Sequence, residues 1–171
     1  NGAGKSTLIK ILNGIYQPTE GRFFFEGEEV KKMDPFRAKE MGISTIPQEF
    51  NLVDHLNVYE NIFLGQEYKK NAMLLDQANM KELTRDLMEE LEAEISPEDR
   101  IGEISVAQKQ MVEIAKAIAY ESKLLIMDEP TTVLTSNEIE ILFSLMRDLS
   151  DQGVTIVYIS HKLPEVKKIC D

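Results

Sequence analysis

Two carboxylates end the apolar run that begins at Leu124, and they are residue types that serve acid–base and metal chemistry. The apolar residues 124–127 predict a buried strand of a parallel sheet, with Asp128 and Glu129 at its carboxyl end. Open α/β sheets place their chemistry at that end. We expect Asp128 to hold Mg²⁺ through water and Glu129 to take a proton from an attacking water. A strand with a solvated acidic turn explains this run alone equally well.

The first residues of the chain match a phosphate-binding loop. Residues 2–7 read Gly-Ala-Gly-Lys-Ser-Thr and fit the closing part of the pattern G-x-x-x-x-G-K-[ST], whose first Gly would precede Asn1. In such a loop, backbone amides surround the phosphates, Lys5 reaches the β- and γ-phosphates and Ser6 holds Mg²⁺. Residues 8–14 predict a helix with a Gly stop, so the loop lies at a helix N-terminus, which favours an anion. Together with the acidic pair downstream, the loop favours nucleotide binding.

Two further strand ends carry side chains that could serve the same chemistry. Residues 43–46 predict a strand that leads to Gln48, whose amide could orient water or coordinate Mg²⁺, although alone it fits an ordinary loop residue. Residues 155–160 predict a second apolar strand followed by His161. The helix between this strand and the acidic one makes a βαβ unit, so His161 and Glu129 share one edge of a parallel sheet. A lone His there is more often structural, but these neighbours favour a functional role.

Composition limits the classes of protein that fit. The 171 residues, 43% of them hydrophobic, suffice for one domain or a core with a small lobe. The net charge of -11 argues against a nucleic-acid partner, because phosphate contacts need clustered Lys and Arg. No apolar run approaches the roughly 18 residues of a membrane span. Cys170 is the only cysteine, which excludes disulfide frameworks and Cys-based metal sites.

Short blocks of the sequence predict the elements that position these residues. Residues 22–26 predict a strand with a hairpin return, whose three Phe side chains we expect in the core, and residues 35–41 predict a short helix. From 57 to about 93 the spacing is helical, with no strand pattern, and indicates a helical lobe inserted into the α/β core. Ser105 is a predicted N-cap of the next helix, and a further helix runs from about 137 to 152.

In order and spacing, these motifs resemble those of the ATPase subunit of ABC transporters, over essentially the whole chain. The resemblance implies an α/β fold of the P-loop NTPase (RecA-like) type, with a mostly parallel sheet core and an inserted helical lobe. It implies a single partial ABC ATPase domain over 1–171, with the core at 1–48 and 110–171 and the lobe at about 49–109. The matching motifs are the Walker A motif at 2–7, the Q-loop at Gln48, the signature at 104–108, Walker B at 124–129, the D-loop at 132–135 and the switch residue His161.

Departures from the family pattern narrow the resemblance. The usual signature has two glycines where this chain has Val106 and Ala107, and the usual D-loop ends in Asp where this chain has Thr135. These features are similar to the first of two tandem ATPase domains in bacterial monosaccharide importers. The galactose and methyl-galactoside group is nearest on residues 95–102 and 105–108, while ribose, xylose and nucleoside importers stay open. Because the substitutions restrict the backbone near phosphate, we expect the site that this signature completes to be the less active of a pair.

The family closes two ATPase domains head to tail over two ATP molecules, and the resemblance implies a role for each matching residue. Ser6, Gln48 and, through water, Asp128 would hold Mg²⁺. Gln48 also counts among the catalytic residues, with Glu129 as base on the attacking water and His161 in contact with the γ-phosphate. The signature residues would complete the nucleotide site of the facing domain. The residues expected to bind ATP are Asn1, Gly2, Ala3, Gly4, Lys5, Ser6, Thr7, Ser105, Ala107 and Gln108.

The same resemblance implies the partners and the location. The partners are the membrane permease subunits, a second ATPase domain and, indirectly, a periplasmic or extracellular sugar-binding protein. The coupling helix of a permease subunit would meet the lobe and residues 50–65. The chain would then act at the cytoplasmic face of the membrane. Three alternatives stay open: an ABC-type ATPase of DNA maintenance, a small-molecule P-loop kinase, and an inactive truncated fragment. The last follows from the missing strand before the phosphate loop, which predicts that the isolated chain self-associates and binds ATP poorly.

Overall fold

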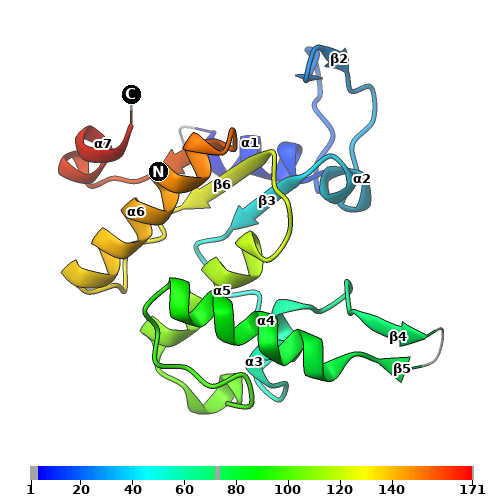
Figure 1. The fold of residues 1–171 in the computed structure, drawn as a ribbon. Helices are drawn as coiled ribbons and strands as arrows, with labels where there is room; N and C mark the ends of the chain where they lie inside the picture. The colour runs from blue at the N-terminus through cyan, green and yellow to red at the C-terminus, as the bar shows by residue number, and fades with distance from the viewer. Residues whose placement is uncertain (1–3, 72–73, 171) are drawn as a thin grey trace.

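A parallel sheet of three strands lies at the centre of the computed structural model, which describes residues 4–71 and 74–170 (Figure 1). Its order is β3-β6-β7, with β3 at Ile43–Ile46, β6 at Leu124–Asp128 and β7 at Thr155–Ile159. The strands predicted around 43, 124 and 155 are therefore confirmed. Both pairings are parallel, with Ile46 opposite Met127 and Asp128 opposite Ile159, so the three carboxyl ends meet at one edge.

Helices cover both faces of this sheet, which explains the unbroken apolar run of β6. Leu125 and Met127 pack into one cluster with α5 (Val106–Ile118) and α6 (Ser136–Asp151). Ile126, which points to the opposite face, packs into a second cluster with α1 (Lys5–Leu12) and α2 (Pro35–Glu40). Each of these three strand residues is at most 1% exposed. A central strand buried on both sides needs apolar residues at every position, as the sequence of β6 provides.

Capping side chains fix where the two long core helices begin. Thr135 caps α6 and Ser105 caps α5, each in a capping box with the Glu or Gln three residues later. The predicted N-cap role of Ser105 is confirmed. Gly153, just past the end of α6, has φ +93, a left-handed conformation that favours glycine.

The segment between β3 and α5 is mainly helical, as the periodicity predicts. It holds α3 (Val58–Ile62), α4 (Gln77–Glu90) and the 3₁₀ turn Ile101–Glu103, which lie below the sheet in Figure 1. Helix α5 runs from this group up to the sheet and packs against α3, α4 and β3. One apolar cluster therefore continues from this segment into the core, and the domain boundaries near 48 and 110 stay a prediction.

The structure corrects two expectations about strands. A hairpin of β4 (Lys69–Asn71) and β5 (Leu74–Leu75) projects from the helical segment, where no strand was expected, because its strands are too short and exposed to leave a period-two pattern. The hairpin predicted near residue 25 is confirmed, but as β1 (Phe24–Phe25) with β2 (Glu28–Glu29). Phe24 is 53% exposed, so its predicted core role is wrong, whereas its two Phe neighbours pack against the second cluster.

The last helix, α7 (Leu163–Ile169), follows β7 after a short connection that contains His161. This connection places the end of β7 and the first turn of α7 beside the end of β6. Among the described residues, no helix has both the length and the apolar character that a membrane crossing requires.

Candidate functional site

The phosphate-loop residues stand at the start of α1, although Asn1, Gly2 and Ala3 lie outside the described residues. Gly4 is the N-cap of α1 and has φ +79, with open space where a Cβ would be. Lys5, Ser6 and Thr7 follow in the first turn and are exposed. The first-turn amides of a helix have no partner within the helix, so they face outward together with these side chains. This end of α1 is therefore open to an anion.

Glu129 and His161 meet at the carboxyl edge of the sheet. His161 Nδ1 lies 3.1 Å from Glu129 Oε1, and the Glu129 amide donates a 2.9 Å hydrogen bond to the Ile159 carbonyl. Glu129 has φ +53, in the left-handed region that costs a residue with a side chain roughly 1–2 kcal/mol. Such strain persists only where the surroundings fix it, and it is common at functional sites. The prediction that the two residues share one edge of the sheet is confirmed.

Asp128, the last residue of β6, is next to Glu129 and within electrostatic reach of Lys5 at the start of α1. Burial and the neighbouring Glu129 raise the pKa of the Asp128 carboxyl, while the Lys5 ammonium opposes this rise. Lys5 thus lies close enough to influence Asp128 electrostatically. Two adjacent carboxylates repel each other, and a cation bound beside them would lower that repulsion.

The oxygen ligands that Mg²⁺ prefers are present at this edge. Ser6 in the first turn of α1 and Asp128 at the end of β6 line one cavity, and Gln48 follows β3 by two residues. Hydroxyl, amide and carboxylate oxygens suit Mg²⁺. No group of three or more His, Cys, Asp and Glu side chains gathers among the residues that the structure describes. The hydroxyl, amide and carboxylate oxygens would fit a Mg²⁺ ion that also binds a phosphate.

Gln48 is exposed just beyond β3, in a loop that is fastened to α5. Asn51, three residues on, donates its backbone amide to the carboxylate of Glu113, and its carbonyl accepts a 3.1 Å bond from Lys116 Nζ. Glu113 is only 3% exposed, and burial raises its pKa, although the Asn51 amide and Lys116 oppose this. Sequence analysis missed Glu113. Its one signal was a carboxylate among the apolar residues of the predicted helix.

The signature residues lie away from this edge. Ser105, Ala107 and Gln108 are at the start of α5, whereas its last turns reach the sheet, and the rise of about 1.5 Å per residue puts roughly 15–20 Å between the two ends. Ser105 and Gln108 bond each other in the capping box, at 2.9 and 3.2 Å. The structure does not bring these residues to Lys5 and Glu129 of the same chain.

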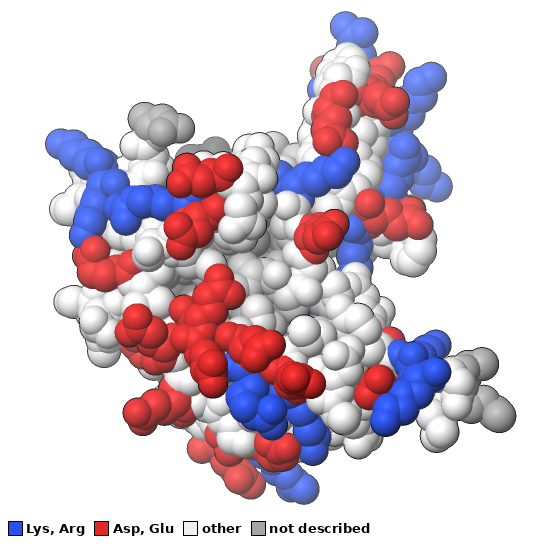
Figure 2. All heavy atoms as spheres, viewed as in Figure 1, with Lys and Arg blue, Asp and Glu red and all other residues white. Residues whose placement is uncertain are grey.

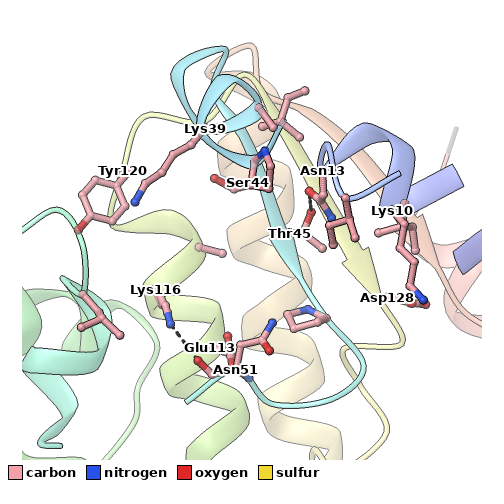
Figure 3. Close-up of a pocket in the computed structure, with 18 of the residues that line it drawn as sticks. Lys10, Asn13, Lys39, Ser44, Thr45, Asn51, Glu113, Lys116, Tyr120 and Asp128 are labelled. Atoms are coloured by element: carbon pink, nitrogen blue, oxygen red, sulfur yellow. Dashed lines mark hydrogen bonds between the residues drawn. The ribbon is translucent and has the colours of Figure 1, made fainter. Parts of the chain in front are cut away.

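A cavity of about 620 Å³ begins beside Ser6 and Asp128 and extends toward α3 (Figure 3). At one end Asn13 and Thr45 are joined by a 2.8 Å hydrogen bond. Toward the other end stands Tyr120, whose ring lies 5.5 Å from Lys39 Nζ. Apolar side chains of α3 and its end, including Ile62 and Leu64, complete the lining. This cavity therefore extends from the carboxyl edge of the sheet to the helical segment.

Acidic side chains dominate another part of the surface. Figure 2 shows many Asp and Glu side chains over α6 and the adjoining helical segment, where Glu90, Glu92, Glu140 and Asp148 line one groove. Such a surface repels nucleic-acid phosphates. The absence of a nucleic-acid partner stays a prediction.

Comparisons with known proteins decide the family. The family model described as ABC transporter matches residues 1–132, which is more than half of the chain. The chain belongs to the ABC transporter family. A putative ribose/galactose/methyl galactoside import ATP-binding protein of Agrobacterium fabrum is 49% identical over 171 residues, covering 100% of this chain and 33% of that protein. A protein of the same description from Halalkalibacterium halodurans is 49% identical over 173 residues, covering 100% and 33%.

Solved ABC cassettes share the fold. A dimeric bacterial ABC transporter cassette matches this ABC-family chain with a TM-score of 0.83 and 26% identity, covering 98% of this chain and 74% of that one. An ATP-binding cassette in a dimeric post-hydrolysis state with ADP and phosphate matches with a TM-score of 0.82 and 26% identity, covering 96% and 72%. These matches confirm the predicted P-loop NTPase fold. The chain spans about a third of the length of the curated relatives it matches.

Proposed function

We propose that this chain supplies the ATP site of an ATPase that powers import of a monosaccharide through an ABC transporter. The observation that carries the proposal is the pairing of Glu129 with His161 at 3.1 Å, at the sheet edge that Asp128 and Lys5 share. The relatives named for ribose, galactose and methyl galactoside import support this class of sugar.

The side chains at this edge divide the work of hydrolysis. Lys5 and the first-turn amides of α1 hold the phosphates, and Ser6, Gln48 and Asp128 hold Mg²⁺. When bound, Mg²⁺ neutralises the charge that develops on the transferred phosphoryl group. Glu129 takes the proton of the attacking water, and its contact with His161 orients both side chains. His161, which is 65% exposed at its side chain, is free to reach the γ-phosphate.

A second ATPase domain completes the arrangement. Because Ser105, Ala107 and Gln108 stand at the far end of α5, we assign them to the nucleotide bound by the facing domain. The dimeric cassettes among the solved structures support such a pairing. Val106 is 54% exposed at this end and is available to an opposing surface.

The permease subunit meets this chain at the cavity between the sheet and the helical segment. Exposed Leu64 and buried Ile62 give the lining an apolar side, and Lys39 and Lys116 give it basic groups. The loop after Gln48 lies along the same cavity through Asn51, so a partner seated there touches the loop that holds a Mg²⁺ ligand. In this arrangement the chain acts at the cytoplasmic face of the membrane, and the sugar-binding protein acts through the permease.

The test is ATP-driven uptake of labelled ribose and galactose into vesicles that carry the full-length protein with its permease. Lys5→Ala removes the phosphate ligand, and we expect it to abolish both ATP binding and uptake. Glu140→Gln is the matched control, because it alters an exposed ion pair with Lys168 away from the edge. Uptake by Lys5→Ala at the rate of the control would contradict the proposal.

A further inference from the structure

A second polar cluster lies directly behind the Glu129–His161 pair and has no part in the proposed chemistry. It centres on the carboxylate of Glu165, in the first turn of α7. We call it the Glu165 cluster. Its members are Thr131, Tyr158, Ser160, Lys162 and Glu165.

The carboxylate of Glu165 forms a hydrogen bond or an ion pair with every other member of the cluster. Thr131 Oγ1 and Tyr158 OH each donate to Glu165 Oε2 at 2.7 Å, and Ser160 Oγ donates at 3.4 Å. Lys162 Nζ lies 3.1 Å from Glu165 Oε1. The side chain of Glu165 is 13% exposed and Thr131 is 2% exposed, so water competes little for these bonds.

Charge and burial show that the cluster is closely coupled. Burial raises the pKa of Glu165, but the hydrogen bonds from Thr131, Tyr158 and Lys162 outweigh it and hold that pKa below its ordinary value. Burial and the bond to Glu165 raise the pKa of Tyr158 to about 12. At neutral pH a carboxylate therefore accepts from neutral hydroxyls, which is the strong form of such a bond.

These bonds fasten the two backbone segments that carry the proposed catalytic side chains. Ser160 and Lys162 flank His161, and both contact Glu165. Thr131 follows Glu129 by two residues, and its carbonyl also accepts a 3.1 Å bond from Lys162 Nζ. The Lys162 amide in turn donates to Ser160 Oγ at 3.0 Å. One partly buried carboxylate thus contacts the backbone segments on both sides of the pair.

The pair needs such support from its backbone. Glu129 holds a left-handed φ of +53, which persists only if neighbouring contacts fix it. His161 is 65% exposed, so packing contributes little to its orientation. Placement of both side chains therefore depends on the segments that hold them.

We propose that Glu165 is a positioning residue that keeps His161 and Glu129 in the mutual arrangement hydrolysis requires. This inference rests on the proposed ATPase function. Glu165 touches neither side chain of the pair in the contacts above, and it acts through Ser160, Lys162 and Thr131. A carboxylate that only stabilised α7 would leave the arrangement of the pair unchanged.

Steady-state ATP hydrolysis by the full-length protein with its permease tests the inference first. Because small misplacement of catalytic groups lowers rates steeply, we expect Glu165→Ala to lower kcat by about 10- to 100-fold, with KM for ATP within about twofold. Glu165→Gln keeps an oxygen for the hydroxyls and loses the ion pair with Lys162, so it should recover much of the rate. Tyr158→Phe keeps the ring and removes one donor, so it should lower kcat by a few fold. This variant replaces Glu165→Ala as the test if the alanine variant does not fold.

Glu140→Ala is the matched control, since Glu140 of α6 forms an exposed ion pair with Lys168 of α7, the helix that also carries Glu165. We expect its kcat to equal that of the wild type. A second measurement needs no hydrolysis: ¹⁵N-histidine NMR of the nucleotide-free protein, with His161 identified by its loss in His161→Gln. The His161 signals should move in Glu165→Ala and stay in place in Glu140→Ala.

The outcomes separate the two proposals. A wild type without ATP hydrolysis refutes the proposed function, whereas unmoved His161 signals in folded Glu165→Ala overturn the positioning role whatever the activity. An active wild type whose kcat is unchanged in Glu165→Ala, or in Tyr158→Phe where the alanine variant does not fold, also overturns it. Adding Glu165→Ala to His161→Ala should lower kcat by a smaller factor than Glu165→Ala does alone, because the part of its effect that acts through His161 is already lost.

Discussion

Replacing the buried Glu113 should destabilise the protein by loosening the loop that follows Gln48. In Glu113→Ala the Asn51 amide loses its carboxylate acceptor and a small void opens at a position that is 3% exposed. A hydrogen bond to a charged group contributes about 1.5–3 kcal/mol, and an unsatisfied amide is costly when buried. Asn51 is itself exposed, so water replaces part of the loss, and we expect a decrease of about 2 kcal/mol in the free energy of unfolding.

The same residue gives a pH dependence with a defined sign. Because the folded-state pKa of Glu113 is raised above 4.5, its charge is unfavourable in the folded protein above that pKa. The folded state binds the proton more tightly, so this cost is relieved as pH falls through the folded pKa. Glu113→Gln carries no such charge. The free energy of unfolding of this variant, relative to that of the wild type, should therefore be higher at pH 7 than just above pH 4.5.

Urea unfolding followed by circular dichroism measures both effects, at pH 7 and at a series of lower values. Glu121→Gln is a suitable control, because Glu121 is an exposed carboxylate just past the end of α5. Two results would refute the reasoning. One is an alanine variant within about 0.5 kcal/mol of the wild type, and the other is a difference between the glutamine variant and the wild type that does not change with pH.

Two further changes have outcomes that the structure specifies. A Cβ on Gly14 would lie 2.2 Å from the Asp34 carbonyl carbon at φ +71, so Gly14→Ala should lower the free energy of unfolding by about 3 kcal/mol or more, seen as a lower Tm; an unchanged Tm would contradict this packing. Ala107 stands where the family signature has glycine, so Ala107→Gly should raise the rate of hydrolysis at the nucleotide site of the facing domain. The rate is measured with the other nucleotide site, which contains Lys5, disabled. No gain in rate would show that the substitution is not what weakens this site.

The strands of the sheet and its carboxyl edge could be predicted from the sequence, because unbroken apolar runs indicate strands that are buried on both faces. Residues 124–127 have to be buried on both faces, and the polar residues that follow them fall at the carboxyl edge by the geometry of parallel strands. Glu129 and His161 therefore came together as expected. Such reasoning needs only local pattern and the right-handed βαβ connection.

The features that were missed depend on contacts between distant segments. Glu113 binds an amide 62 residues away, and Glu165 binds Thr131, which is 34 residues away, so neither pairing leaves a mark in local spacing. The pairing of β4 with β5 was missed because these strands hold three and two residues, too few to show alternation. Phe24 was misplaced because a strand two residues long faces solvent on one side.

The central claim is that Glu129 drives ATP hydrolysis at this edge of the sheet. A single-turnover measurement with the full-length protein, using excess protein over radiolabelled Mg-ATP, tests it most directly. We expect Glu129→Gln to bind ATP with unchanged affinity and to hydrolyse it at least about 100-fold more slowly, since removing a general base typically costs 10²–10⁴ in rate. Hydrolysis by Glu129→Gln at the wild-type rate, with ATP bound equally well, would contradict the account.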